Sequence, residues 1–539
     1  MAAVTREPDG QAGADRQAAP DQHDGPNEHA RPPVPSVPSS PGQVSAMLAD
    51  AVLRTPSAPA VRDAERAWTY RELDVAANAV RDTLTRSGVR PGDRVALRSR
   101  NRCEVAAALF GTLRAGAALV PLSPQLPPSG LAQVLADAEP AALLAPAKEL
   151  PELPGVPCPV LTLEDAVVPE ASSTPGQDAP GQDAPADPSA TALLVYTSGS
   201  TSAPKGVICP HSAVDFAARA INQRLRYRSS DVVLVGSPFS FDYGLYQLLL
   251  SVLAGAELVL ADAEDPVGMV KLVRRTRATV LPIVPSTARM LSRLARRGER
   301  IDHVRMFTNT GAALTASDIQ GLRDAFPGCS VVLMYGITEC KRVTIAGPDV
   351  DLTRPGSSGT ALDGTVVRII DEAGEEAAPG VIGEITVTGP HVMAGYRGAP
   401  ELTAQRYDTD PFGGGRRLRT GDYGSLDADG HLYFHGRRDD QFKRRGVRAS
   451  LIEVEAAAAR VPGVGTVAVL PPEGASDLTL FVTGDREPQE VLDELAGLLE
   501  PAKVPADCHR LPELPLTGNG KTDKKRLREM LRPTTGSTT

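Results

Sequence analysis

The sequence predicts an α/β protein: a large N-terminal domain of parallel α/β sheets with a β-rich subdomain, and a small α+β domain at the C-terminus. The first observation behind this prediction is that apolar strand-like runs alternate with helical patterns of about 10–15 residues, as they do in parallel βαβ units. The second is chain size, because 539 residues, 42% of them hydrophobic and 23% charged, can bury more than one core. The third is a change of pattern after residue 365, where turn signals begin to separate short strands.

The predicted elements of the large domain come in βαβ order. The first part of the chain holds a helix, a strand, a second helix and a second strand, over residues 70–87, 94–97, 104–114 and 117–121. Further apolar runs predict strands over residues 232–235, 257–261, 279–284 and 331–334. Strands separated by helices in this way indicate parallel pairing.

Turn signals mark the later part of the chain. Glycine and aspartate at 371–374 and 427–430 predict hairpins, and therefore a β-rich subdomain before the chain leaves the large domain. From residue 441 a smaller α+β unit is predicted, with a helix, two strands and a helix over residues 451–460, 466–470, 479–482 and 488–499.

Three segments lack any apolar periodicity and are predicted to lie outside the packed cores. Residues 1–42 are rich in Pro, Asp, Gln and Gly, so they cannot offset the entropy of ordering and are predicted to be disordered. Residues 171–190 contain a tandem G-Q-D-A-P and are predicted to form a flexible linker inside a large domain at 43–438. The small domain then covers 439–532, and residues 533–539 form a tail.

Composition excludes several classes of function. The formal charge of −9 offers no basic stripe for nucleic acid or an anionic membrane, so a small or carrier-bound substrate is favoured. No apolar run is long enough to span a bilayer and no leader pattern precedes the first helix, which predicts a cytoplasmic protein. The six cysteines lie far apart, without the spacing of a zinc site or a disulfide framework. Only Cys340 adjoins a segment with functional residues.

The most informative segment is Y-T-S-G-S-T-S-A-P-K-G-V at 196–207, which follows an apolar run. Glycine lets backbone N–H groups turn towards an anion, hydroxyls add donors, and Lys205 adds a charge that can follow a pyrophosphate. A strand before the loop and a helix start at His211 favour this phosphate site over a plain linker. The predicted phosphate-binding residues before the lysine are Thr197, Ser198, Gly199, Ser200 and Thr201.

This loop resembles the signature of the adenylate-forming superfamily, which includes acyl-CoA ligases, luciferases and nonribosomal peptide adenylation domains. Further segments follow in the family's order across nearly the whole chain. They lie at 308–314, 334–339, 418–422, 436–446 and 514–521. The resemblance implies an AMP-forming ligase that uses ATP and Mg²⁺.

The segment M-Y-G-I-T-E at 334–339 follows an apolar strand, where ligands collect in open α/β sheets. By the resemblance, Tyr335 stacks on adenine, Gly336 belongs to the nucleotide site, Thr338 contacts the α-phosphate and Glu339 holds Mg²⁺. A carboxylate suits this last role because Mg²⁺ prefers oxygen ligands and keeps several waters.

Three more nucleotide contacts are implied by the resemblance. Gly311 belongs to a turn near the adenine edge, although Ala312 replaces the glutamate that is usual there. Asp422, in a T-G-D, accepts hydrogen bonds from the ribose hydroxyls, and Arg437 approaches the ribose or a phosphate. Asp439 would be the hinge that makes the small domain mobile.

The segment L-P-L-T-G-N-G-K at 514–521 resembles the family's P-x-T-x-x-G-K. The resemblance implies that Lys521 enters the active site during adenylation and leaves it when the small domain rotates. The other catalytic residues implied by the resemblance are Lys205, Thr338 and Glu339. One site would then serve two half-reactions.

The acid substrate is approached through F-S-F-D-Y-G at 239–244. Amino-acid-activating members place an aspartate here that pairs with the substrate ammonium, so Asp242 favours an amino acid; a merely local hydrogen bond of Asp242 is the alternative. Arg342 could bind an acidic substrate side chain, or face the nucleotide or solvent. The residues that would line the pocket are Asp242, Tyr243, Tyr246, Ile283, Thr308, Thr310, Met334, Arg342 and Val343.

The leading functional hypothesis is therefore ATP-dependent adenylation of an amino acid and transfer to the phosphopantetheine thiol of a separate carrier protein. No carrier signature follows Lys521, which favours a free-standing enzyme. An acyl-CoA ligase that activates a non-amino acid is the runner-up. A nucleotide-binding scaffold without turnover is the third hypothesis, against which stand the intact Lys205, Glu339, Asp422 and Lys521.

Overall fold

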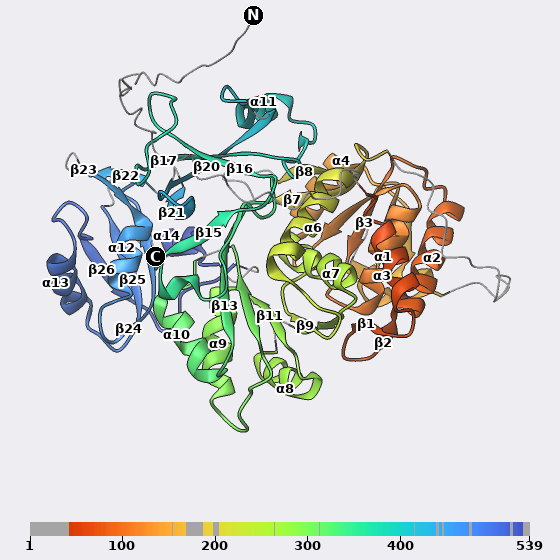
Figure 1. Cartoon of the computed structure of the whole chain (residues 1–539), viewed down its shortest axis with the longest axis horizontal. Helices are drawn as coiled ribbons and strands as arrows, with labels where there is room; N and C mark the ends of the chain where they lie inside the picture. The colour runs from red at the N-terminus through yellow and green to blue at the C-terminus, as the bar shows by residue number, and fades with distance from the viewer. Residues whose placement is uncertain are drawn as a thin grey trace, which may run out of the picture. The chain divides into compact units, whose positions relative to one another are not determined.

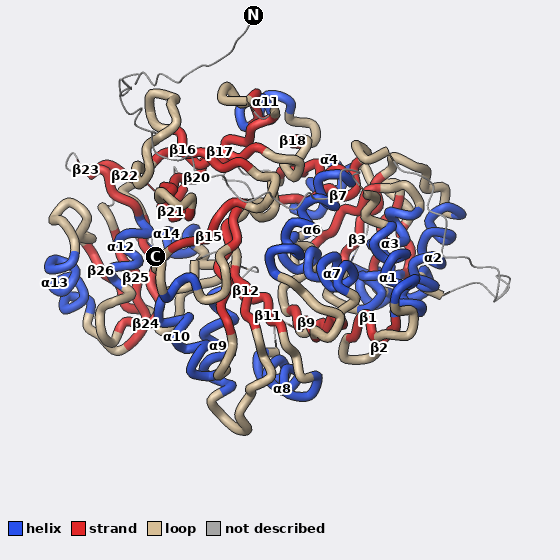
Figure 2. The backbone as a smooth tube through the Cα atoms, in the orientation of Figure 1, coloured by secondary structure: helices blue, strands red, loops and turns tan. Residues whose placement is uncertain are grey.

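The computed structural model of the chain is shown in Figure 1, and Figure 2 marks its helices and strands. It describes residues 42–152, 155–168, 187–197, 204–262, 265–311, 313–413, 415–437, 441–444, 447–473, 477–517 and 521–531. Everything said below about elements and contacts concerns these residues. The predicted N-terminal segment, most of the linker at 171–190 and the hinge residue Asp439 lie outside them.

A fourteen-stranded sheet carries the candidate site. One half is parallel from β1 through β10, β9, β11 and β12 to β13, with β2 at the edge. Its strands are β1 Pro59–Arg62, β2 Ala67–Thr69, β9 Val232–Val235, β10 Glu257–Leu260, β11 Val280–Ile283, β12 Met306–Asn309 and β13 Ser330–Tyr335. The antiparallel half consists of β14 Thr344–Ile345, β15 Ser357–Ala361, β16 Val366–Ile370, β17 Gly383–Thr388, β19 Tyr407–Thr409, β20 Arg416–Leu426 and β21 His431–Arg437.

A seven-stranded sheet has the order β18-β8-β7-β4-β3-β5-β6. Its central strands are parallel, while β7 and β8 form an antiparallel hairpin. The strands are β3 Arg94–Arg98, β4 Ala118–Leu122, β5 Ala142–Ala145, β6 Val160–Thr162, β7 Thr191–Thr197, β8 Lys205–Pro210 and β18 Gly395–Tyr396.

Helices cover both sheets. The helix α3 is buried along its whole length, and α8, α9 and α10 pack on the parallel half of the large sheet through one apolar cluster (Figure 1). The helices are α1 Ala46–Arg54, α2 Tyr70–Arg86, α3 Cys103–Arg114, α4 Pro128–Ala138, α5 Leu163–Ala166, α6 His211–Leu225, α7 Asp242–Ala254, α8 Pro266–Thr276, α9 Pro285–Ala295, α10 Ala316–Ala325 and α11 Pro400–Arg406, with 3₁₀ turns η1 Ala147–Glu152 and η2 Val350–Leu352.

The C-terminal part has its own apolar core, formed by α12, α13 and a three-stranded sheet. Its elements are the hairpin β22 Gln441–Arg444 and β23 Val447–Ser450, then α12 Leu451–Ala458, β24 Val464–Leu470, β25 Thr479–Gly484, α13 Pro488–Leu498, β26 Asp507–Arg510 and α14 Lys524–Leu531. In β24–β25–β26 the first pair is antiparallel and the second is parallel.

The α/β prediction is confirmed. The strand at 232–235 has the predicted bounds, and the other predicted strands and helices differ at their ends by one or two residues. Such shifts are expected because an element ends where caps and pairing partners end, which periodicity does not report. The domain boundaries stay predictions.

All six cysteines are free thiols. None of the helices in the described part of the chain is long and apolar enough to cross a membrane.

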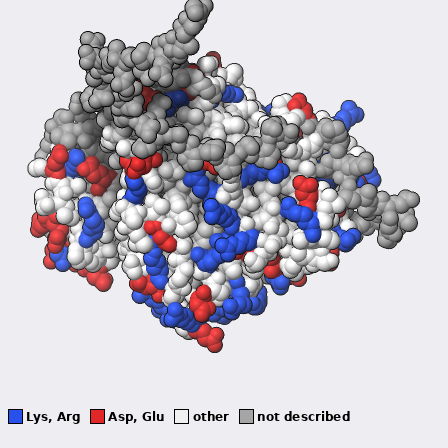
Figure 3. Space-filling view, in the orientation of Figure 1, with Lys and Arg blue, Asp and Glu red and all other residues white. Residues whose placement is uncertain are grey.

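Charge is unevenly spread over the surface. Figure 3 shows one face with both signs, on which Lys and Arg gather in the middle and along the lower edge, where α8 and α9 lie in Figure 1. These helices carry the exposed cations Lys271, Arg275 and Arg293. Cations therefore gather on this face although the whole chain is acidic.

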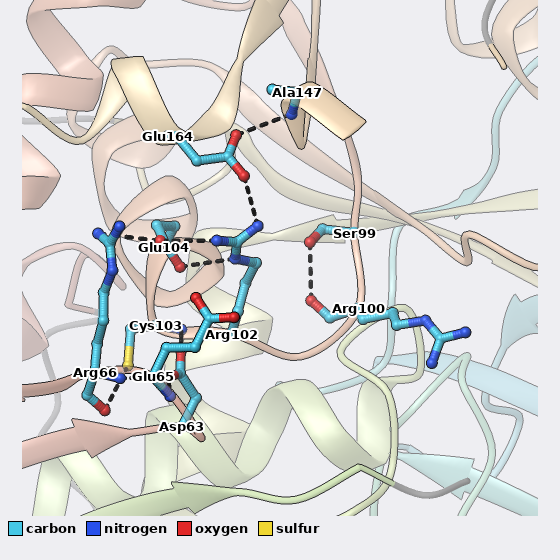
Figure 4. Close-up of polar contacts among 10 residues, drawn as sticks. All are labelled: Asp63, Glu65, Arg66, Ser99, Arg100, Arg102, Cys103, Glu104, Ala147 and Glu164. Atoms are coloured by element: carbon cyan, nitrogen blue, oxygen red, sulfur yellow. Dashed lines mark hydrogen bonds and ion pairs between the residues drawn. The ribbon is translucent and has the colours of Figure 1, made fainter. Parts of the chain in front are cut away.

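An ion cluster around the buried Glu104 holds the turn between β3 and α3 (Figure 4). Glu104 is fully buried and pairs with Arg66 at 3.2 Å and with Arg102 at 2.9 Å. Arg102 also reaches Glu164 on α5 at 2.7 Å. The backbone N–H of Cys103 donates to Asp63 at 2.8 Å, so the turn is tied to the β1–β2 hairpin as well.

His391 predicts acid sensitivity of the fold. Its ring is fully buried beside Phe216, neither ring nitrogen has a hydrogen-bond partner among the described residues, and burial lowers its pKa from 6.5 to about 4. Between pH 6.5 and 4 the unfolded chain therefore binds a proton at this residue that the folded chain does not bind. The free energy of unfolding that is present above pH 6.5 is lost as the pH falls towards 4, and the loss is about 2 kcal/mol at pH 5. In urea unfolding, His391→Gln is expected to reduce the drop in unfolding free energy between pH 7 and 5; an unchanged drop would contradict the assignment.

Candidate active site

The predicted phosphate loop connects β7 to β8. Thr197 at the end of β7 is paired with Lys205 at the start of β8, so the hairpin brings the lysine to the base of the loop. The hydroxyl of Tyr196 donates to Asp137 on α4, which ties the hairpin to a helix. Ser198, Gly199, Ser200 and Thr201 lie outside the described residues.

Three predicted nucleotide residues meet at the end of β13. The hydroxyl of Tyr335 donates to Oδ2 of Asp422 at 2.8 Å, and Nε of Arg437 lies 3.3 Å from Oδ1. The Tyr335 ring stacks on Phe434, with centroids 5.6 Å apart and planes at 29°. Burial raises the pKa of Asp422, and the charge of Arg437 and the hydrogen bond from Tyr335 oppose that rise. Asp422 is thus held in one orientation by two donors.

Glu339 lies on the turn that follows β13, with Thr338 beside it. The hydroxyl of Tyr396 in β18 donates to its Oε1 at 2.7 Å, and none of the described residues donates to Oε2. Tyr396 comes from a segment that the motifs did not include. Gly336 opens this turn, and a Cβ there would lie 1.8 Å from the carbonyl oxygen of Lys341, so only glycine fits.

The donor set fits a Mg²⁺ ion shared with phosphates. The described residues hold no group of three or more His, Cys, Asp or Glu side chains that could bind a metal by themselves. One carboxylate, together with phosphate oxygens and waters, is the usual arrangement for Mg²⁺ at a nucleotide. Glu339, with one oxygen oriented by Tyr396, can supply that carboxylate.

Lys521 approaches the turn that follows β12. A Cβ at Gly311, whose φ is +84°, would lie 3.8 Å from Cε of Lys521. Loss of surrounding water lowers the pKa of the Lys521 ammonium and repulsion from Arg437 adds to this, while Asp242 and Asp422 act in the opposite sense. The residue as a whole is exposed, so solvent screens these effects.

Asp242 is the first residue of α7 and faces a cation that the motif comparison did not weigh. Nζ of Lys341 lies 3.7 Å from Oδ2 of Asp242 and 5.6 Å from the centre of the Tyr246 ring. The Lys341 side chain is 1% exposed, and Nζ has no hydrogen-bond acceptor among the described residues. The sequence pointed to Cys340 and Arg342, whereas it is Lys341 between them that faces Asp242.

Arg342 is buried as well, 5% exposed, and its guanidinium lies 4.9 Å above the ring of Tyr243. The hydroxyl of Tyr243 donates to the backbone carbonyl of Thr308 at 2.7 Å. The side-chain amide of Asn309 donates to the carbonyl of Ile283 at 3.3 Å. These contacts bring predicted pocket residues on α7 together with those at the ends of β11 and β12.

The remaining predicted pocket residues lie around the same strand ends. Thr310 is buried just after β12, and Met334 is buried in β13. The backbone N–H of Val343 donates to the carbonyl of Tyr335 at 2.9 Å, which folds the segment with Lys341 back over β13. The site thus gathers acidic and basic side chains from five distant segments.

The family of AMP-binding enzymes matches residues 48–397, and its C-terminal domain matches residues 453–521. Among curated relatives, a dimodular nonribosomal peptide synthase of Bacillus subtilis (strain 168) is 32% identical over 500 residues, which is 88% of this chain and 21% of the relative. Enterobactin synthase component F of Escherichia coli (strain K12) is 32% identical over 514 residues, 90% of this chain and 39% of the relative. The chain thus spans about a fifth to two fifths of their length.

Solved structures give a similar picture. The crystal structure of VinN is 43% identical with a TM-score of 0.66, over 73% of this chain and 99% of VinN. A complex of VinN with L-aspartate is 42% identical with a TM-score of 0.65, over 73% and 98% of the two chains. ATP-bound MatB from Rhodopseudomonas palustris is 27% identical with a TM-score of 0.80, over 91% and 99%.

Proposed function

The chain belongs to the family of AMP-binding enzymes, and from that premise we propose that it is an AMP-forming ligase that activates an acidic amino acid. The single observation that carries the proposal is the approach of Lys521, from the C-terminal part, to Gly311, just after β12, where predicted nucleotide and acid residues also lie. Lys521 comes from the C-terminal part, Asp242 is the predicted substrate aspartate and Asp422 is the predicted ribose aspartate. These residues can serve one reaction if the nucleotide and the acid bind side by side.

In the first half-reaction a substrate carboxylate oxygen attacks the α-phosphorus of ATP. An O–P bond forms, the bond from the α-phosphorus to the bridging oxygen breaks, and pyrophosphate leaves. Lys521 neutralises charge on the carboxylate and the α-phosphate, and Lys205 follows the leaving pyrophosphate. Glu339 would hold Mg²⁺, which spreads the charge of the phosphates. Positioning and charge neutralisation supply most of the catalysis in phosphoryl transfer of this kind.

In the second half-reaction a thiol attacks the acyl carbon and AMP leaves with the former carboxylate oxygen. We assign the thiol to the phosphopantetheine arm of a carrier protein, because the curated relatives are peptide synthases. Rotation about Asp439 would withdraw Lys521 between the two steps. Free CoA as acceptor is the alternative, and thiol competition between CoA and a carrier protein separates the two.

The substrate class follows from buried charges. Asp242 can pair with a substrate ammonium, but Lys341 beside it and Arg342 on Tyr243 add two buried cations. A buried ammonium without a hydrogen bond is costly, and a second substrate carboxylate would satisfy it. The complex of VinN, a relative in structure, with L-aspartate supports the same class.

A pyrophosphate-exchange panel tests the proposal. Acidic amino acids are expected to support exchange at least about 10-fold better than their amides or the corresponding diacids without an amino group, because each of these loses one charge that the site pairs. Exchange only with acids that lack an amino group would contradict the amino-acid assignment. ATP binding in calorimetry without any acyl-adenylate by mass spectrometry would instead favour a scaffold.

A further inference from the structure

The loop between β9 and α7, residues 236–241, delivers Asp242 to the first turn of α7. Its backbone is held by one side chain from the other sheet. Nδ2 of Asn101 donates to the carbonyl of Ser237 at 2.9 Å, and the N–H of Phe239 donates to Oδ1 of Asn101 at 2.9 Å. One amide thus satisfies a backbone acceptor and a backbone donor two residues apart.

The loop transmits its position directly to α7. A Cβ at Gly244 would lie 2.4 Å from the carbonyl oxygens of both Ser237 and Pro238, so loop and helix are in close contact. The N–H of Phe241 also donates to the carbonyl of Pro238 at 3.0 Å. A shift of the loop would therefore displace the start of α7, and Asp242 with it.

Asn101 itself has a rigid base. It lies in the turn between β3 and α3, whose next residue, Arg102, is clamped between Glu104 and Glu164 (Figure 4). The hydroxyl of Ser99 donates to the carbonyl of Arg100 at 2.9 Å on the other side of the turn. The turn belongs to the seven-stranded sheet, whereas β9 belongs to the large sheet. Asn101 therefore fixes the position of the 236–241 loop relative to the anchored turn between β3 and α3.

We propose that Asn101 is a positioning residue for substrate recognition, which places Asp242 at its distance from Lys341 and so shapes the site for the charged groups of the acid. The inference rests on the proposed function. It concerns a side chain 136 residues from Ser237 in sequence and outside every nucleotide motif.

Pyrophosphate exchange with the full chain tests this role. Asn101→Ala removes two neutral hydrogen bonds and is expected to lower kcat/KM for an acidic amino acid about 10-fold, with the KM for ATP unchanged. Asn101→Ser, whose hydroxyl is too short to reach both groups, is expected to do the same. Asn78→Ala is the matched control, because Asn78 is a half-buried asparagine on α2 that accepts from Arg114. Unchanged kcat/KM, or an equal rise in the KM for ATP, would overturn the proposal.

A double-mutant cycle separates positioning from a general structural role. Asp242→Asn alone is expected to cost about 100-fold in kcat/KM for the acidic amino acid. If Asn101 acts through Asp242, adding Asn101→Ala to that variant should cost less than about twofold more. A further full tenfold loss would overturn the inference. No loss in Asp242→Asn itself would contradict the proposed function. That result differs from a further tenfold loss in the double variant, which would contradict only the role of Asn101.

Discussion

Replacement of Lys521 by alanine should reduce formation of the acyl-adenylate about 100- to 1,000-fold. The reason is that its ammonium is the only cation that the C-terminal part, as far as the structure describes it, brings beside Gly311, and one preorganised donor at a developing charge supplies about this factor. The measurement is single-turnover formation of the adenylate, followed by mass spectrometry. Thiolation of chemically supplied acyl-adenylate should remain largely intact in the same variant.

The matched control is Lys525→Ala, which removes an exposed lysine four residues along the chain without touching the site. Adenylation by this variant should match the parent protein. Equal loss of both half-reactions in Lys521→Ala would contradict a lysine that acts in one step only. Full adenylation activity of Lys521→Ala would contradict the role in adenylation that the proposed function gives to Lys521.

Replacement of Lys341 by methionine should lower kcat/KM for an acidic amino acid about 100-fold or more. Methionine keeps a long unbranched side chain, but it leaves Asp242 without its buried partner and removes one of the two buried cations available to the second substrate carboxylate. Truncating one side of a buried charge pair costs about 2–5 kcal/mol. The measurement is the ratio of exchange rates for an acidic amino acid and its amide. This ratio should fall towards one, and a general loss of folded protein would not move it.

An exposed lysine provides the comparison for this variant. Lys271→Met makes the same substitution at a solvent-exposed lysine on α8. The ratio of exchange rates for the acidic amino acid and its amide should then equal that of the parent protein. A Lys341→Met enzyme that still prefers the acidic amino acid by the full margin would show that Lys341 does not pair with the substrate. Arg342 would then be the remaining buried cation for that role.

The fold could be predicted where local pattern and tertiary environment agree. The continuous apolar run at 232–235 forms β9, because a strand in the parallel part of a sheet covered by helices is apolar at every position. The hairpin turn at 427–430 could also be predicted, because Asp427 and Gly430 are residues that favour a tight turn between β20 and β21. Element ends were less legible, because partners in other strands determine them.

The nucleotide residues that we propose could be predicted because each stands in a short, recognisable motif: Glu339, Asp422 and Lys521. Their partners could not. Tyr396, which orients Glu339, is 57 residues away, and Asn101 holds a loop 136 residues away. Neither side chain has a local pattern that distinguishes it from an ordinary core or turn residue.

By itself the sequence determined the α/β class and the family resemblance, and it predicted the groups proposed to bind a nucleoside triphosphate, because these depend on periodicity and on residue type at fixed spacing. Only the tertiary structure decided that Lys341, rather than Arg342, faces Asp242, and that the first turn of α7 is positioned from the opposite sheet. The physical reason is that the burial and pairing of charges depend on which chain segments meet in space. The backbone of Lys341 is left-handed, with φ of +58°, and turns its side chain into the core at a position that sequence periodicity does not predict.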